Sequence, residues 1–382
     1  MLIAPLKRTL MRLFPLCLLA LVALGSTGCS FKTRQSFLDP KGPLALMQYD
    51  LFMVTVWVTL FIFLVVGGAL LWVVIRFRER PGDGNKPMPA QSHGNPLVEI
   101  GLIGVSVLLL VIIAIPTLRG IAYMHELPEG GESRLGQWFS GELSGEDAED
   151  VLTVNVIGYQ WWWAFEYPQL GVTTANELVI PKGKVVKLNL RSADVIHSFW
   201  LPKIAGKVDL IPGRGNWMWI QGDEVGHYYG QCAEFCGSAH AYMLFRSDVL
   251  SDEDFGAWVV AQKQEAVEPL DVEVAQGREL FTSKTCIQCH TIRGNALAMG
   301  VKGPDLTHVA TRKTLAAGIL DNRNERGAID SSVQKENLFN WVKNSQHIKP
   351  GNLMYYDTAG LKHVPLSDEE VNKIVAYLQT LN

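Results

Sequence analysis

The sequence predicts a protein of several domains: a transmembrane helical hairpin, then an all-β domain, then an all-α domain. Three observations lead to this fold class. Two long segments carry no formal charge, residues of alternating polarity follow them, and the composition shifts again after Pro269 toward segments of helical pattern. A chain of 382 residues is long enough for two or three domains.

The first 28 residues have the composition of a secretory signal peptide. Lys7, Arg8 and Arg12 precede an apolar run over residues 13–24, and small residues then lead to Cys29. This order is typical of an exported chain whose leader is removed. Lipidation of Cys29 and retention of the leader as an anchor are the alternatives to simple cleavage.

Residues 29–119 are predicted to form the hairpin, with membrane spans at about 51–75 and 97–118. Each apolar run is long enough to cross ~30 Å of hydrocarbon, and a buried core helix is the competing interpretation. The connecting loop is rich in arginine and lysine, which predicts a cytoplasmic loop and an exported remainder. Glu99 begins the second span, either as a carboxylate favoured by the helix dipole or as a group that collects protons.

Residues 120–268 are predicted to form the all-β domain. Apolar and polar residues alternate over 151–157 and again over 186–191, which is the period of half-buried strands. Turn residues separate these strands, so we expect a small antiparallel sandwich or barrel. Residues 120–270 carry 10 basic and 21 acidic groups, a balance that disfavours nucleic acid as a partner and favours a basic protein.

Metal-ligating side chains gather at the end of this domain. Cys232, Cys236, His240 and Met243 lie within one short segment, and His197 precedes them by 35 residues. Two thiolates and two imidazoles are also a zinc set, and a disulfide between the two cysteines is a further alternative. The thioether favours copper, because a neutral soft ligand adds little for zinc. Two cysteines four residues apart can bridge two copper ions.

These ligands, the hairpin, and the segments 158–167 and 194–200 together resemble subunit II of cytochrome c oxidase, over about residues 40–250. The resemblance implies a cupredoxin-like domain that holds the binuclear copper centre CuA. It implies that Cys232 and Cys236 bridge the copper ions and that His197 and His240 each bind one. Met243 and the backbone carbonyl of Glu234 are then the axial ligands.

The same resemblance implies three further roles. The Glu234 carboxylate would bind magnesium where this subunit meets the catalytic one. Trp161 would be an exposed indole above the copper, at which electrons enter, although packing alone is the commoner role of an aromatic run. Glu99 would lie at the mouth of the proton channel called the K-pathway.

Residues 271–382 contain the covalent haem attachment motif Cys286-Ile-Gln-Cys289-His290. The two cysteines would form thioether bonds to haem c and His290 would bind its iron. A thioredoxin-like dithiol is the alternative, but no βαβ pattern surrounds the motif.

The sixth iron ligand is expected at Met354, because Met299 follows His290 by only nine residues and is too close to reach the other haem face. A methionine and histidine pair raises the haem potential, and a core methionine is the alternative. The segment 303–306 resembles the loop of class I cytochromes c that covers the proximal histidine. A capping box at Ser367 and Glu370 predicts a final helix of a small all-α haem domain.

The resemblance implies the subunit through which electrons enter a respiratory cytochrome c oxidase, an oxidoreductase and translocase of the bacterial inner membrane. Cytochrome c or a quinol–cytochrome c reductase would donate electrons to haem c. The copper centre would pass them to catalytic subunit I, which reduces oxygen to water with proton translocation. Other oxidase subunits and membrane lipid would be further partners, and no nucleic acid is expected.

The haem domain carries 13 basic and 12 acidic groups, so the covalent tether is expected to replace electrostatic steering. Two other classes stay open. One is a stand-alone electron carrier or an enzyme of the nitrous oxide reductase type, and the other is a copper assembly or storage protein.

Overall fold

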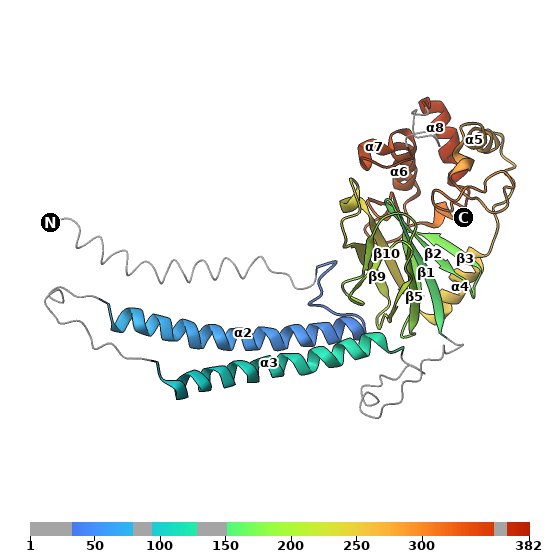
Figure 1. The fold of residues 1–382 in the computed structure, drawn as a ribbon. Coiled ribbons are helices and arrows are strands. Elements are labelled where there is room, and N and C mark those ends of the chain that lie inside the picture. The colour runs from blue at the N-terminus through green and yellow to red at the C-terminus, as the bar shows by residue number, and fades with distance from the viewer. Residues whose placement is uncertain (1–32, 79–93, 128–150, 355–364) are drawn as a thin grey trace, which may run out of the picture.

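A computed structural model of the chain describes residues 33–78, 94–127, 151–354 and 365–382. Two long helices extend from a β-sandwich, and a helical domain lies on another side of that sandwich (Figure 1). The predicted signal peptide, Cys29 and most of the loop between the two spans lie outside the described residues.

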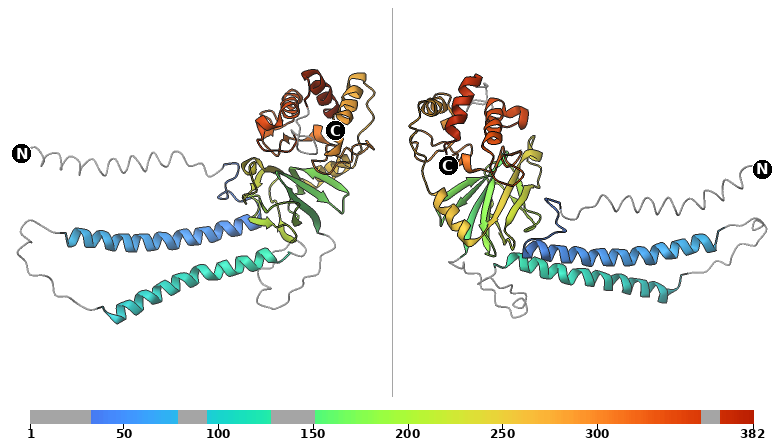
Figure 2. Two further views of the ribbon diagram at one scale, coloured as in Figure 1. Left: turned by 45° about the horizontal axis from the view of Figure 1, so that its top comes forward. Right: turned by 180° about the vertical axis from the view of Figure 1, so that it is seen from behind.

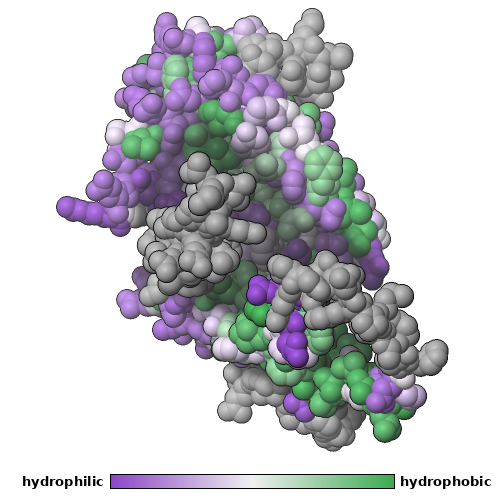
Figure 3. All heavy atoms as spheres, turned by 90° about the vertical axis from the view of Figure 1, so that its left-hand side faces the viewer, coloured by the Kyte–Doolittle hydropathy of each residue, from purple (hydrophilic) through white to green (hydrophobic). Residues whose placement is uncertain are grey.

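The two hairpin helices are α2 Pro43–Arg76 and α3 Pro96–His125. Their middle parts expose large apolar side chains, such as Phe63 at 69 % and Leu110 at 65 %, and both helices point away from the other domains (Figure 2). Seen from the side to which the hairpin points, hydrophobic side chains gather on it and hydrophilic ones cover much of the larger domains (Figure 3). Such a surface is suited to lipid rather than water.

Both helices are longer than the predicted spans of 51–75 and 97–118. Their extra turns lie at the sandwich, where Leu44 of α2 and Tyr123 of α3 join the core of the β domain. The Tyr123 ring packs edge-on against Trp219 at 5.4 Å. These turns anchor the sandwich to the hairpin, and apolar content alone could not predict them.

The β-sandwich consists of two five-stranded sheets. The first has the order β3-β2-β1-β5-β8, with β1 Leu152–Tyr159, β2 Trp162–Tyr167, β3 Val172–Ala175, β5 Val186–Ser192 and β8 Asn216–Ile220. The second has the order β4-β10-β9-β6-β7, with β4 Glu177–Pro181, β6 His197–Trp200, β7 Lys207–Leu210, β9 Gly226–Cys232 and β10 Leu244–Leu250.

The all-β sandwich is as predicted and most of its strand pairs are antiparallel as expected, but two pairs are parallel. β1 pairs with β5 in parallel, and β4 pairs with β10 in parallel. The cause is that the chain crosses between sheets: β4 follows β3 into the second sheet and β5 then returns beside β1. Apolar alternation fixes which face of a strand is buried but not the direction of its neighbour.

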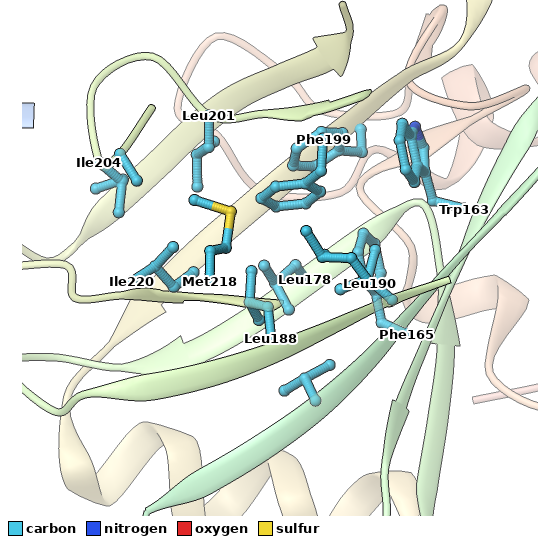
Figure 4. Close-up of a cluster of buried hydrophobic side chains, with 14 of the residues drawn as sticks. Trp163, Phe165, Leu178, Leu188, Leu190, Phe199, Leu201, Ile204, Met218 and Ile220 are labelled. Carbon is cyan, nitrogen blue, oxygen red and sulfur yellow. The ribbon is translucent and has the colours of Figure 1, made fainter. Parts of the chain in front are cut away.

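Large apolar side chains from both sheets fill the space between them (Figure 4). Trp163 and Phe165 of β2 meet Phe199 of β6 there, with ring centroids 5.9 and 6.4 Å apart, in edge-to-face contact. All three side chains are fully buried. This core supports the strand ends at which the candidate ligands lie.

The C-terminal domain has its own core and is mostly helical. Its elements are α4 Asp252–Gln262, which leads into it, α5 Val272–Ser283, the short β11 Thr314–Leu315 and β12 Leu320–Asp321, α6 Ser331–Lys343, α7 Ser345–Ile348 and α8 Asp368–Leu378. The predicted capping box is confirmed, since Ser367 and Glu370 bond reciprocally at the start of α8.

Candidate functional site

The cysteines of the β domain lie at one end of the sandwich with the other predicted ligands. Cys232 ends β9, and Cys236, His240 and Met243 follow in the loop to β10. The Cys236 sulphur lies 3.8 Å from that of Cys232, 3.5 Å from His240 Nδ1 and 3.8 Å from the Met243 sulphur. His197, the first residue of β6, has its ligand nitrogen within 4.8 Å of both cysteine sulphurs.

This arrangement fits a metal centre better than a disulfide. Both cysteines are free and buried. Two sulphurs about 2.3 Å from a shared metal and 3.8 Å apart would subtend an angle of about 110°, close to tetrahedral. Within the described part of the chain, no hydrogen-bond partner reaches the buried His197 Nδ1, and because Nε2 donates to Asp194 the Nδ1 lone pair is free for a ligand role.

The two cysteines cannot both ionise without a positive charge between them. The Cys236 thiol, and to a smaller degree His197, lower the pKa of Cys232 to about 3, while the Cys232 thiolate raises the pKa of Cys236. The pair therefore gives up one proton readily and keeps the other, because two thiolates side by side repel. A bound cation removes that repulsion and lets both sulphurs ionise.

Neighbouring polar groups orient these ligands. Asp194 Oδ1 accepts a hydrogen bond from His197 Nε2 at 2.8 Å, and the ring is fully buried. Gln160 Nε2 and Trp161 Nε1 both donate to the Cys236 carbonyl, at 2.7 and 2.9 Å. Such partners fix ring orientation and loop position in metal sites.

Gly237 is required in this loop. Its φ of +118° is disfavoured for residues with a side chain, and an added Cβ would lie 2.9 Å from the Trp161 ring. The loop can therefore approach the indole closely.

The expectation of an exposed Trp161 indole is wrong. The side chain is only 9 % exposed, because the C-terminal domain covers it near Gly351. Trp163 lies in the core and Trp162 is half-buried outside it, stacked on Tyr159 at 4.5 Å, as alternation predicts. Core packing therefore accounts for Trp163, whereas Trp161 and Trp162 face the C-terminal domain.

The haem motif lines a cavity of about 370 Å³ between the two domains, which we call the haem cavity. This volume lies within the usual range of small-molecule sites, and apolar side chains of α5, α6 and α8 form much of its wall. Its lining includes Cys286, Cys289, His290 and Met354 from one domain and Gln160, Trp161 and Trp162 from the other.

His290 has one ring nitrogen available as a ligand. Its Nδ1 lies 2.8 Å from the Pro304 carbonyl and donates to it, which leaves Nε2 as the free acceptor. Burial lowers the pKa of His290, so the ring is neutral at pH 7. An added Cβ at Gly303 would lie 2.7 Å from this ring, so the segment 303–306 covers the histidine closely, as predicted.

Burial raises the pKa of Cys286 to about 11. A thiol that resists ionisation is poorly suited to zinc or to dithiol exchange at neutral pH. Both cysteines of the motif line the haem cavity, where a group held in the cavity could be attached to them.

The two candidate methionines differ as predicted. Met354 lines the haem cavity, whereas Met299 is 75 % exposed and does not. The Asn352 side chain accepts from the Met354 backbone N–H at 3.0 Å and from Ser345 at 3.0 Å. This polar contact fixes the backbone that carries the thioether.

Of the two remaining predicted residues, Glu234 borders the cysteine cluster through its backbone and Glu99 lies apart from both clusters. The Glu234 carbonyl is 3.2 Å from the Cys232 sulphur while its side chain is exposed, so the two groups face different surroundings. Glu99 lies in the first turn of α3, after an N-cap at Asn95, far along the chain from both centres.

Sequence reasoning missed the residues that support the ligands. Asp194 could have been found, since an acidic residue three positions before a ligating histidine is a common orienting partner. No pattern in the sequence pointed to Lys349. Its buried Nζ donates to the Trp161 carbonyl at 2.5 Å, and burial lowers its pKa to about 7.

Comparison with known proteins agrees with this geometry. Residues 170–248 match the family described as cytochrome c oxidase subunit II, periplasmic domain, and residues 274–382 match the cytochrome c family. These two domains imply copper and haem binding.

Relatives resemble the chain over almost its whole length. Cytochrome c oxidase subunit 2 of Alkalihalophilus pseudofirmus is 34 % identical over 98 % of each chain, and that of Bacillus subtilis is 34 % identical over 95 % of this chain and 96 % of its own. A crystal structure of the periplasmic domain of subunit II from Bradyrhizobium japonicum is 37 % identical over 29 % of this chain and 93 % of its own, with a TM-score of 0.29. The chain therefore belongs to the cytochrome c oxidase subunit II family, in the form with a C-terminal cytochrome c domain, and is a membrane-anchored subunit of a haem–copper oxidoreductase complex.

Proposed function

We propose that electrons enter a respiratory oxidase through this chain, from a cytochrome c or a quinol–cytochrome c reductase. They would be accepted in the haem cavity, pass Trp161 and leave through the copper centre toward the catalytic subunit, where oxygen is reduced to water with proton translocation. Bound haem and copper would each take up and release single electrons. One observation carries the proposal: Trp161 lines the haem cavity and also bonds the Cys236 carbonyl at 2.9 Å.

We assign the ligands from the two clusters of donors. Haem c would be held by Cys286, Cys289, His290 and Met354, and binuclear copper by His197, Cys232, Cys236, His240, Met243 and the Glu234 carbonyl. Asp194 keeps His197 oriented, and the two donors to the Cys236 carbonyl hold the loop in place. The buried setting excludes water from both sulphurs, and a rigid dry site changes little when it gains or loses charge.

Three finer assignments belong to the same proposal. The exposed Glu234 carboxylate would bind magnesium where this chain meets the catalytic subunit. Glu99, in the first turn of α3, would take up protons for the oxidase at the membrane boundary. The hairpin of residues 29–119 would span a bacterial inner membrane twice. The domains at 120–268 and 271–382 would then lie on the periplasmic side, supported by the exposed apolar surface of α2 and α3.

Metal and haem analysis of the purified full chain tests the proposal. We expect two copper ions for each covalent haem. We also expect a paramagnetic spectrum of seven lines, because one electron shared equally by two copper nuclei of spin 3/2 couples to both. Four lines would indicate a single copper ion, and colourless zinc would indicate a structural site. Either result, or a chain without covalent haem, would overturn the assignment.

A further inference from the structure

The C-terminal domain contacts the β-sandwich through a specific polar surface, which we call the docking surface. Thr314 donates to Glu177 through its backbone N–H at 2.7 Å and its hydroxyl at 3.0 Å, and Lys313 pairs with Asp248 at 3.0 Å. Arg246 donates to the Gly318 carbonyl at 2.5 Å. Glu177 and Arg246 are direct neighbours on β4 and β10, so β11 and its flanking residues lie across these strands.

Lys349 makes a separate contact, with the turn between β1 and β2 that carries Trp161. It follows α7, is 3 % exposed, and donates from Nζ to the Trp161 carbonyl across 188 residues of sequence. Among the residues that the structure describes, no carboxylate lies within ion-pair distance of Nζ. A buried amino group without a partner is strongly unfavourable, so this carbonyl determines where the side chain can lie.

The residues after Lys349 connect this contact to the haem cavity. Gly351 has φ +88°, and an added Cβ would lie 2.4 Å from Ser238 Oγ and 3.9 Å from the Trp161 ring. Asn352 donates to the Lys349 carbonyl at 2.6 Å and accepts from the Met354 N–H. The segment 349–354 is therefore a short, hydrogen-bonded connection between Trp161 and Met354.

We propose that Lys349 is a positioning residue for electron transfer: its bond to the Trp161 carbonyl holds the segment 349–354, and with it the haem cavity, against the indole. The same contact covers Trp161, so the external donor binds the C-terminal domain and not the indole. This inference rests on the proposed function, because it assumes that electrons pass from the haem cavity to the copper centre.

The test uses the purified oxidase complex with Lys349→Met, which keeps the length of the side chain and removes its amino group. Lys343→Met is the matched control, since Lys343 bonds only within its own domain among described residues, to Asp368 at 2.8 Å and the Leu366 carbonyl at 2.6 Å. Hydrogen exchange of residues 158–164 is measured first. We expect about tenfold faster exchange in Lys349→Met, the scale of one lost buried hydrogen bond, and no change in Lys343→Met.

The second measurement is the rate of electron transfer from flash-reduced haem to copper. We expect this rate and kcat to fall about tenfold in Lys349→Met while KM for the donor stays unchanged, because the donor binds elsewhere. Haem and copper spectra should match those of the wild type. Wild-type values for exchange and transfer, or a raised KM with an unchanged rate, would overturn the inference.

A second variant covers the case in which Lys349→Met does not fold. Gly351→Ala leaves the amino group in place and pushes the same segment away from Ser238, so it should change both readouts in the same direction. Unchanged readouts in Gly351→Ala would contradict the inference. A wild-type complex without any haem-to-copper transfer would instead refute the proposed function itself.

Discussion

Met354 shows how a single side chain can be tested apart from its domain. Its thioether lines the haem cavity, and its backbone is held by Asn352. In Met354→Ala the haem should stay attached through Cys286 and Cys289, while the thioether-to-iron absorption band disappears, because the sixth ligand is lost. The near-infrared and red absorption of the oxidised protein measures this. Met299→Ala is the control, and an unchanged band in Met354→Ala would show that another group binds the iron.

Asp194 supports the proposed copper centre in two ways: it orients His197 and it accepts a hydrogen bond from the Gln160 backbone N–H at 2.6 Å. Replacing Asp194 by asparagine keeps the size of the side chain but weakens the bond to His197 Nε2 at 2.8 Å. We expect copper affinity to fall about 10- to 100-fold, the usual effect of losing a partner that orients a ligand. Competition with a copper chelator measures the affinity. The exposed Asp209→Asn on β7 should bind copper as the wild type does, and equal affinities in both variants would remove Asp194 from the site.

Residue types and spacing predicted which candidate ligands lie together where those ligands are neighbours in the sequence. Cys232, Cys236 and Met243 fall within one loop, and their spacing alone limits how far apart they can lie. Exposure was harder to predict. Trp161 was expected to face solvent, and it is covered by a segment 188 residues away, which no local pattern reveals.

At the level of elements, the hydrophobic pattern predicted what is buried but not how strands pair. The helix α8 was predicted with its cap and its apolar face, since both depend on neighbours within a few residues. The parallel pairs β1 with β5 and β4 with β10 depend on which sheet each strand joins. That choice follows from packing of the whole sandwich, so it could not be read from alternation.

Glu177 on the edge strand β4 makes the docking surface sensitive to pH. Desolvation by the C-terminal domain, with help from Asp248, raises the pKa of Glu177 to about 7 from an ordinary value of 4.5, although Arg312 and Thr314 act in the opposite direction. The docked state therefore holds the proton more tightly than the open state. The contribution of protonated Glu177 to the stability of the docked state is complete below about pH 4.5 and is lost as the pH rises through about 7.

Glu177→Gln removes this pH dependence because an amide does not ionise. We expect the variant to melt at a higher temperature than the wild type at pH 8, with the difference shrinking toward pH 5. Thermal unfolding across this range measures it, with the exposed Glu279→Gln of α5 as a control that should follow the wild type. Parallel curves for Glu177→Gln and the wild type would contradict the assignment.

At the scale of the whole molecule, the order of hairpin, sandwich and haem domain could be predicted from the sequence. The contact between the sandwich and the haem domain could not. The two cores are separate, and a tether acting through high local concentration was the expectation. The bonds between Thr314 and Glu177 and between Lys349 and Trp161 join residues 137 and 188 positions apart. These contacts imply a fixed arrangement, in which the proposed transfer from haem to copper would need no diffusive search.

If the arrangement is fixed, salt should affect electron transfer from the external donor to the haem but not electron transfer from the haem to the copper centre. A donor that binds the nearly neutral C-terminal domain would still be drawn toward the chain by the acidic region 120–270, whose 21 acidic and 10 basic groups attract a basic protein over distances that salt screens. Raising the ionic strength from about 10 to 150 mM should therefore raise KM for a basic cytochrome about tenfold or more. The internal rate from haem to copper should stay constant, because the docking contacts are short and partly buried. Stopped-flow and flash-reduction measurements on one preparation give both values, and an acidic donor should show no rise in KM. An internal rate that falls with salt would show that the haem domain reaches Trp161 by steering on its tether.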